Sequence, residues 1–149
     1  MMFLPPLTCT GFVNWAKGSG CSRYDDAIAA AIDQDNNFYV AGAFQEENFY
    51  FGNYYLQNNG EYDFFILKYN GMGNEIWATS AGGVLNDYAV DIRVNQYHNI
   101  FICGYFRSES ITFGNYTIIN SGSYDVFAAK YGILPYNSID LPSCYMDSD

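Results

Sequence analysis

One histidine and two nearby acids are the residues that could take part in acid–base or metal chemistry. His98 is the only histidine among the 149 residues. A general base acts on a nucleophile or a second acid held beside it, and no serine or cysteine motif of that kind accompanies His98. We therefore interpret His98 as a turn residue, in the place where an earlier turn carries Asn36. We predict no catalytic residue and no enzymatic activity.

The segment "DQDNN" places Asp33 and Asp35 in a pattern that faintly resembles a calcium loop. It lacks the glycine and the closing glutamate of an EF-hand, and the matching turn "NQYHN" keeps neither acid. The cysteines do not supply ligands instead, because no two of them have CxxC spacing. We predict neither a metal site nor a cofactor.

The four cysteines are Cys9, Cys21, Cys103 and Cys144. Cys103 lies within an apolar strand pattern, so we expect it to be a small buried residue. Cys9 and Cys144 lie near opposite ends of the chain. A disulfide between these two is one alternative, and free thiols are the other.

Two long connections rich in tyrosine and asparagine are the candidates for ligand binding. They read "FQEENFYFGNYYLQNNGEYD" and "FRSESITFGNYTIINSGSYD". Loops carry function on a rigid scaffold of strands, which favours these connections over the strands beside them. The candidate residues are Tyr54, Asn58, Tyr116 and Asn120.

These connections belong to a duplicated unit. The segment "GEYDFFILKYN" returns 62 positions later as "GSYDVFAAKYG", and the same shift relates "NNFYVAGAF" to "HNIFICGYF". Between 15–70 and 77–132, 21 of the 56 aligned positions are identical without a gap. A fixed period of this length indicates a repeat architecture. The recurring positions that we expect to have structural roles are Trp15, Trp77, Asp25, Asp87, Asp63, Asp125, Gly42 and Gly104.

The recurring tryptophans and acids each have a structural and a functional interpretation. Trp15 and Trp77 could stack on sugar rings, but a repeated position inside a strand favours packing between units. Recurring aspartates indicate turns held by side-chain to backbone hydrogen bonds, with ligand contact as the alternative.

Each unit reads as four short strands. The first, "AIAAAID", is ambiguous because alanine favours helix, but its counterpart "AVDIRVN" alternates apolar and polar residues, which indicates a strand. The second strand is "FYVAGAF" or "IFICGYF", and the third is the nearly continuous apolar run "YDFFILKY" or "YDVFAAKY". The glycine-rich turn "NGMGN" then leads to a fourth strand, "EIWATSA".

Four antiparallel strands in a unit of about 40–60 residues are typical of a β-propeller blade. The predicted fold is all-β, with propeller-type blades of four antiparallel strands and two blades' worth of sequence. A β-sandwich of two similar halves is the alternative. The predicted segments are an N-terminal non-repeat segment (1–11), an orphan fourth strand (12–19), blade repeat 1 (20–82), blade repeat 2 without its fourth strand (83–132) and a C-terminal tail (133–149).

The motifs "GSYDVFAAKY", "NEIWATSAGG" and "DYAVDIRVNQYHNIFICGYF" resemble the SBBP-type β-propeller repeat. The resemblance covers both units, from about Trp15 to Tyr131, and includes the order and spacing of the motifs. It departs from the family at the Asp-x-x-Gly-Asn turn, which lacks its glycine in "DQDNN" and "NQYHN". The resemblance implies an extracellular or cell-surface protein without an assigned enzymatic activity.

Two blades are too few for a closed propeller, which needs roughly 4–8. The order of one orphan strand, one full blade and three strands predicts that the orphan strand completes a blade of another copy. Such head-to-tail pairing would give a homo-oligomer, closed into a ring if the rotation permits. The alternative is a fragment of a longer propeller, with flanking blades supplied by the parent protein.

Composition restricts the partners. Sixteen acids against six basic residues give a formal charge of −10, which disfavours nucleic acid and anionic membrane surfaces. No apolar run approaches the roughly 18–20 residues that span a bilayer. The sequence therefore predicts a module that recognises carbohydrate or protein through blade-end loops. A self-assembling subunit of a ring, fibre or surface layer is the alternative.

Overall fold

The computed structural model describes residues 11–132, and every regular element within them is a β-strand. The all-β prediction is confirmed, and the alanine-rich first segment is a strand. The strands are β1 (Asp25–Ile32), β2 (Phe38–Phe44), β3 (Asn48–Phe51), β4 (Tyr54–Gln57), β5 (Asp63–Tyr69), β6 (Glu75–Ala81), β7 (Asp87–Val94), β8 (Ile100–Phe106), β9 (Ser110–Phe113), β10 (Tyr116–Ile119) and β11 (Asp125–Tyr131).

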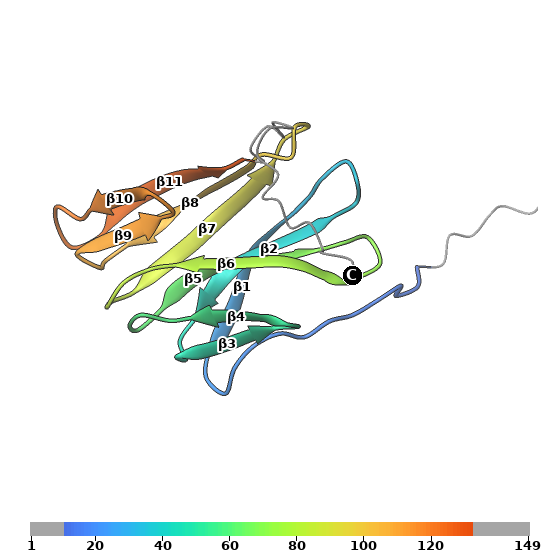
Figure 1. Cartoon of the computed structure of the whole chain (residues 1–149), viewed down its shortest axis with the longest axis horizontal. Helices are drawn as coiled ribbons and strands as arrows, with labels where there is room; N and C mark the ends of the chain where they lie inside the picture. The colour runs from blue at the N-terminus through green and yellow to red at the C-terminus, as the bar shows by residue number, and fades with distance from the viewer. Residues whose placement is uncertain (1–10, 133–149) are drawn as a thin grey trace, which may run out of the picture.

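Two antiparallel sheets form the two repeat units (Figure 1). In blade 1 the strand order is β1-β2-β5-β6, and in blade 2 it is β7-β8-β11. In each of these two sheets, the strands lie side by side in the order in which they occur along the chain, so the last strand lies at an edge, as in a propeller blade. Blade 2 has three strands within the described residues, so β11 is an edge strand there.

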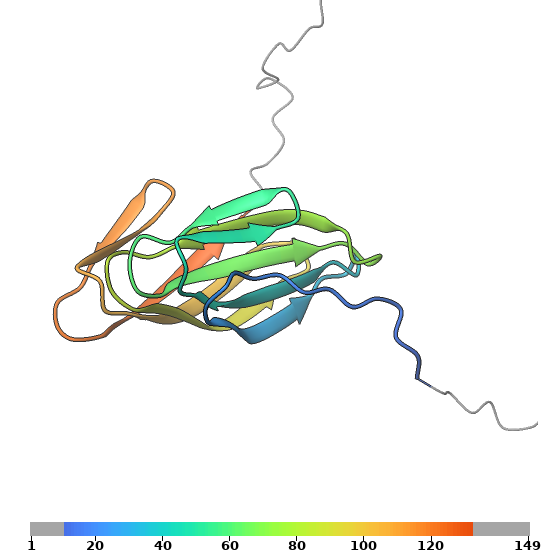
Figure 2. The same cartoon turned by 90° about the horizontal axis from the view of Figure 1, so that it is seen from below.

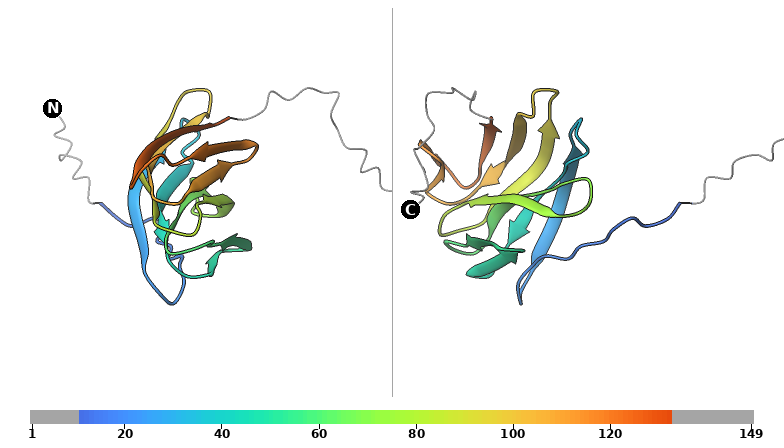
Figure 3. Two further views of the ribbon diagram at one scale, coloured as in Figure 1. Left: turned by 90° about the vertical axis from the view of Figure 1, so that its left-hand side faces the viewer. Right: turned by 45° about the vertical axis from the view of Figure 1, so that its right-hand side comes forward.

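The sequence predicts loops for the two long connections, but neither is a simple loop. Each contains a short antiparallel hairpin, β3-β4 in the first unit and β9-β10 in the second. Both hairpins stand on the same side of the blade pair (Figure 3). The hairpin strands are only four residues long, and glycine-containing turns with positive φ at Gly52 and Gly114 join them. Four residues are too few to show an alternating pattern of apolar and polar residues, so the sequence did not reveal these strands.

The blades stack face to face, as layers in Figure 2. Strand β7 packs against β1 and β2, and the buried cluster between the blades joins residues of both units. Phe64 of blade 1 stacks on Phe127 of blade 2, with ring centroids 5.1 Å apart. The Asp87 backbone N–H also donates to the Tyr62 carbonyl, 2.7 Å away. Apolar burial between the two sheets is therefore the main stabilising contact between the units.

A second buried cluster lies on the opposite face of blade 1. There the β3-β4 hairpin supplies Phe49 and Phe51, which pack on Phe44, Phe65 and neighbouring side chains of β2 and β5. Strand β5 is consequently buried on both faces. This explains why its sequence is a continuous apolar run instead of an alternating one.

Gly42 and Gly104 lie at matching irregularities in the two blades. The ladder between the first and second strands shifts register between Ala27 and Ala29 in blade 1, and between Ala89 and Asp91 in blade 2. A Cβ added at either glycine would lie 1.9 Å from a backbone carbonyl oxygen of the bulged strand. Only glycine allows the strands to approach this closely at the bulge.

Several predicted features lie outside the described residues. These are the tail (133–149), almost all of the N-terminal segment (1–11), and the cysteines Cys9 and Cys144. Within the described part of the chain, no helix is long and apolar enough to cross a membrane.

The bulge glycines give a direct stability test. We expect Gly104→Ala to lower the free energy of unfolding by about 1–3 kcal/mol, because the added Cβ meets the Tyr88 carbonyl and the Phe127 ring. Urea denaturation followed by tryptophan fluorescence measures the change. Gly122→Ala is the control, since nothing lies within 4 Å of a Cβ there. Equal stability of the two variants would contradict the close approach at the bulge.

Candidate functional site

The outward face of blade 2 is an exposed apolar surface. We call it the trailing face, and its residues are Phe101, Cys103, Tyr105, Val126 and Ala128. Their equivalents 62 positions earlier in blade 1 are all buried, and all of them except Ala43 belong to the cluster between the blades. Val126 is 84% exposed, whereas Phe64 at the equivalent position is 0% exposed.

Cys103 is exposed, so the prediction of a buried cysteine is wrong. The pattern of β8 alternates strictly between buried and exposed residues. Cys103 lies on the exposed side, where blade 1 has Ala41 packed against its neighbour. The apolar strand pattern was detected correctly, but no described residue covers this side of β8.

The opposite end of the blade pair has a matching open surface. We call it the leading face, and its residues are Ala27, Ala30, Ile32, Phe38 and Val40. Ile32 is 62% exposed, whereas Phe38 and Val40 are half-buried against the cluster that contains the β3-β4 hairpin. The equivalents of these residues in blade 2 all pack into the cluster between the blades. The two open faces are therefore equivalent to the two faces that meet inside the chain.

The segment before β1 reproduces the position of a fourth strand. The Trp15 ring lies 5.6 Å from the Tyr69 ring, and Trp77 on β6 lies 6.0 Å from Tyr131 at the equivalent position. Residues 12–19, predicted as a strand, form no ladder with any other part of the described chain. Strand β6 pairs with β5 of its own blade, whereas the described residues contain no earlier strand with which 12–19 could pair.

The four recurring aspartates hold the loops that precede their strands. Asp25, Asp63, Asp87 and Asp125 each accept a hydrogen bond from the backbone N–H four residues earlier, at 2.7–2.9 Å. Asp87 additionally accepts bonds from the backbone and hydroxyl of Ser108. Each carboxylate thus satisfies loop donors that would otherwise be unpaired.

Among these four aspartates, Asp63 has the environment that is least favourable for a charged carboxylate. It is fully buried at the junction of the blades, and its Oδ1 atom has no hydrogen-bond partner. Burial raises the pKa of Asp63 to about 6, and the charge of the buried Asp87 adds to this effect. A Cβ at Gly82 would lie 2.2 Å from Oδ1, so glycine is needed there as well.

The predicted ligand-binding residues serve mainly internal contacts. The Asn58 amide donates to the Phe44 carbonyl at 2.8 Å, and Asn120 donates to the Phe106 carbonyl at 3.0 Å. The Tyr54 hydroxyl donates to the carbonyl of Ile76. Of the four candidates, only Tyr116 extends its side chain into solvent, with 79% exposure.

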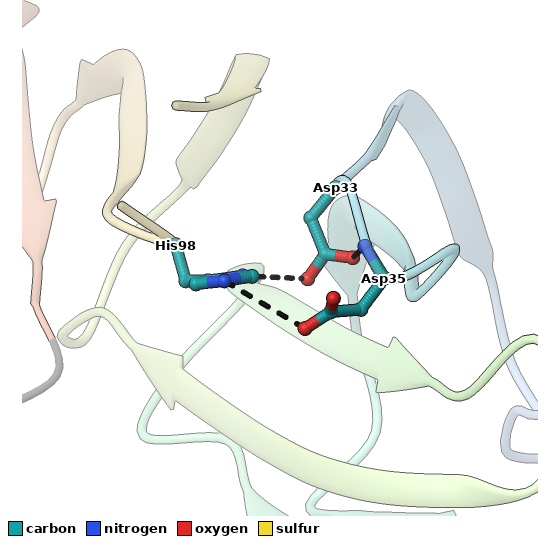
Figure 4. Close-up of side chains that lie close together, drawn as sticks. All are labelled: Asp33, Asp35 and His98. Atoms are coloured by element: carbon teal, nitrogen blue, oxygen red, sulfur yellow. Dashed lines mark hydrogen bonds and ion pairs between the residues drawn. The ribbon is translucent and has the colours of Figure 1, made fainter. Parts of the chain in front are cut away.

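A cluster that spans the two blades brings together residues that the sequence left separate. His98, in the turn after β7, faces both Asp33 and Asp35 of the turn after β1 (Figure 4). His98 Nδ1 is 3.3 Å from Asp33 Oδ2, and Nε2 is 3.6 Å from Asp35 Oδ2. His98 is a turn residue with φ of 59°. Sequence analysis considered each residue alone, because only blade stacking places them together.

A pocket of about 260 Å³ adjoins this cluster between the blades. Tyr39, Trp77, Ile100 and Tyr131 form its apolar walls, and His98 lines its rim. The Lys68 ammonium lies over the Tyr39 ring at 5.1 Å from the ring centroid. Burial raises the pKa of Tyr131 to about 12, so its hydroxyl stays protonated at neutral pH.

Comparison with known proteins supports the repeat fold. No family model matches the chain. It is 31% identical over 84 residues to an uncharacterized WD repeat-containing protein of Acanthamoeba polyphaga mimivirus. The match covers 52% of this chain and 6% of that protein. The chain stacks a four-stranded sheet on a three-stranded one and is similar to a WD repeat-containing protein. Together these findings indicate a β-propeller-type repeat module. They do not single out the SBBP type of repeat.

The buried carboxylate gives a pH-dependent prediction. Because the folded-state pKa of Asp63 lies above the unfolded value near 4, folding is favoured by protonation and stability falls as the pH rises from about 4 to 6. We expect Asp63→Asn to raise the free energy of unfolding by about 1–3 kcal/mol at pH 8, with little effect at pH 4. Urea denaturation at the two pH values measures this.

Asp125→Asn is the matched control for that experiment. Asp125 occupies the equivalent position, and hydrogen bonds from the Ser121 backbone and hydroxyl lower its pKa. Its substitution should therefore bring no gain in stability at pH 8. An Asp63→Asn protein no more stable than wild type at pH 8 would show that the buried charge is not costly.

Proposed function

We propose that this chain is a non-enzymatic propeller-type subunit that assembles head to tail with further copies of itself. The trailing face of one copy covers the leading face of the next. One observation carries this proposal: every residue of the two open faces except Tyr105 has an equivalent in the buried cluster between blade 1 and blade 2. The contact already made within the chain is thus the template for the contact between chains.

Strand completion adds a second contact to the same interface. In blade 1, β5 pairs with β6, whereas in blade 2 the equivalent strand β11 is an edge. Residues 12–19 already pack on blade 1 through Trp15, as β6 packs on blade 2 through Trp77. Docking a copy on the leading face would place its β11 beside this segment. Pairing the two removes an exposed edge, which otherwise invites uncontrolled association.

The contact is heterologous, so it closes into a ring only if successive rotations sum to a full turn. Propellers contain roughly 4–8 blades. Three copies would give about six blades and four copies about eight, whereas a rotation that does not close would give a fibre. We propose the closed ring, in a protein located outside the cell or at its surface and built from SBBP-type repeats. The location and repeat type rest on the sequence motifs.

Recognition of carbohydrate or protein through blade-end loops is the second candidate function. The exposed Tyr116 on the β9-β10 hairpin supports it. The internal hydrogen bonds of Asn58 and Asn120 count against direct roles for these two amides. A glycan that raised the melting temperature of the protein would favour this function.

Light scattering behind a sizing column tests head-to-tail assembly. We expect the wild-type chain to elute as a species of three or four times 16.8 kDa. Val126→Asp should shift it to monomer, because the charge lies at the centre of the trailing face. Val126 is 84% exposed in the single chain, so the substitution should leave the fold intact.

Val84→Asp provides the matched control. Val84 is 67% exposed in the connection between the blades and belongs to neither open face. It should assemble as wild type does. A wild-type chain that remained monomeric at every concentration would overturn the proposal, as would equal assembly of the Val126→Asp variant.

Trp15→Ala tests strand completion separately. Trp15 contacts Phe38 and Tyr69, so its loss should weaken both the fold of the single chain and its assembly. We expect a lower melting temperature and at least about a tenfold higher dissociation constant of the oligomer, equivalent to about 1.4 kcal/mol. Unchanged melting and unchanged mass would rule out a role for residues 12–19 in the interface.

A further inference from the structure

One departure from repeat symmetry lies where the turn after β1 meets the turn after β7. The first turn has Asp33 and Asp35, where the second has Asn95 and Tyr97. The second has His98, where the first has Asn36. Stacking of the blades brings the three non-equivalent residues to one place (Figure 4). Within the turns "DQDNN" and "NQYHN", the three positions that differ between the copies are those of the residues that meet across the junction.

The turn itself does not require the two acids. Asp33 Oδ1 accepts hydrogen bonds from the backbone N–H groups two and four residues later. Asn95 Oδ1 accepts the same two bonds in the second copy. A neutral amide therefore supports this turn as well as a carboxylate does. Similarly, Asn36 and His98 share a φ of 59°, so the imidazole is not needed for the backbone conformation.

Ligand atoms from the three side chains all lie within 4.8 Å of one another. The Asp33 side chain is fully buried, that of His98 is 29% exposed, and that of Asp35 is 70% exposed. The cluster is consequently anchored on a buried carboxylate and open to solvent on one side. An ion could enter from the Asp35 side without disturbing the blades.

Neighbouring side chains orient the buried Asp33 carboxylate. The Tyr39 hydroxyl and the Asn37 amide donate to Asp33 Oδ2 at 2.9 and 2.8 Å. Hydrogen bonds of this kind commonly fix the carboxylates that bind metal ions. Hydrogen bonds from Asn37, Tyr39 and His98 outweigh burial and hold the pKa of Asp33 well below its usual range.

We propose that Asp33, Asp35 and His98 form a binding site for a divalent transition-metal ion, with Zn²⁺ as the best match. One imidazole nitrogen and two carboxylates form a mixed ligand set that Zn²⁺ accepts, and water would complete the tetrahedron. Ca²⁺ fits less well because it prefers six to eight oxygen ligands. The bound ion would tie blade 1 to blade 2 and so stabilise the stacked pair.

Calorimetric titration with zinc chloride tests the site on the chelator-treated full chain. We expect one ion per chain at this site and a rise in melting temperature with zinc concentration. His98→Asn should weaken zinc binding at least tenfold and abolish that rise. This variant restores the residue found in the equivalent turn at the same φ, so its fold should survive.

Asp33→Asn is the second variant, because Asn95 holds the equivalent turn. It should also lose zinc binding. Cobalt absorption provides a control for thiol binding, since Cys21 and Cys103 are free thiols. If wild type binds no zinc, or if both variants bind it as tightly as wild type, the proposal is wrong. The cluster would then be an ion pair between blades only.

Discussion

The structure depends on one constraint: each blade is a sheet with two apolar faces, and both must be covered. Between blade 1 and blade 2 this is achieved by stacking, with Phe64 against Phe127 and with Ile66, Ile92 and Ile102 in the same buried cluster. The other face of blade 1, the leading face, is covered in part by its own hairpin and by Trp15, and its β1 side stays exposed. Because the units are equivalent, the same requirement applies to the two faces that remain open. We propose head-to-tail assembly on this ground, with the hydrophobic effect as its driving force.

Buried aspartates and closely packed glycines determine how the blades meet. The recurring aspartates satisfy loop donors at one end of each sheet, and the bulge glycines allow the first two strands to approach closely. One of these aspartates lowers stability at the junction, because Asp63 is buried there with an unpaired oxygen. The junction also gathers the residues that break repeat symmetry, Asp33, Asp35 and His98. A repeat that stacks on itself thus leaves its junctions as the places where new chemistry can arise.

Much of the fold could be predicted because the unit is written twice. The second copy of the first strand, with its clear alternation, resolved the alanine-rich Ala27–Ile32 segment as a strand. The hairpins β3-β4 and β9-β10 were missed because four-residue strands carry too little periodicity. The burial of Cys103 was misjudged because its strand pattern does not reveal whether a neighbouring blade is present. His98 was assigned only to its turn, since its partners lie 65 and 63 positions away in the chain and meet it only after stacking.

The thiol of Cys103 provides the most direct measurement of the central claim. It lies on the trailing face, where the equivalent Ala41 is fully buried. The rate of its alkylation, followed by peptide mass spectrometry, should fall as protein concentration rises and assembly covers the face. Loss of this protection in the Val126→Asp variant would tie it to the trailing face. A labelling rate that is the same at every concentration, in a chain that is otherwise folded, would contradict stacking between copies.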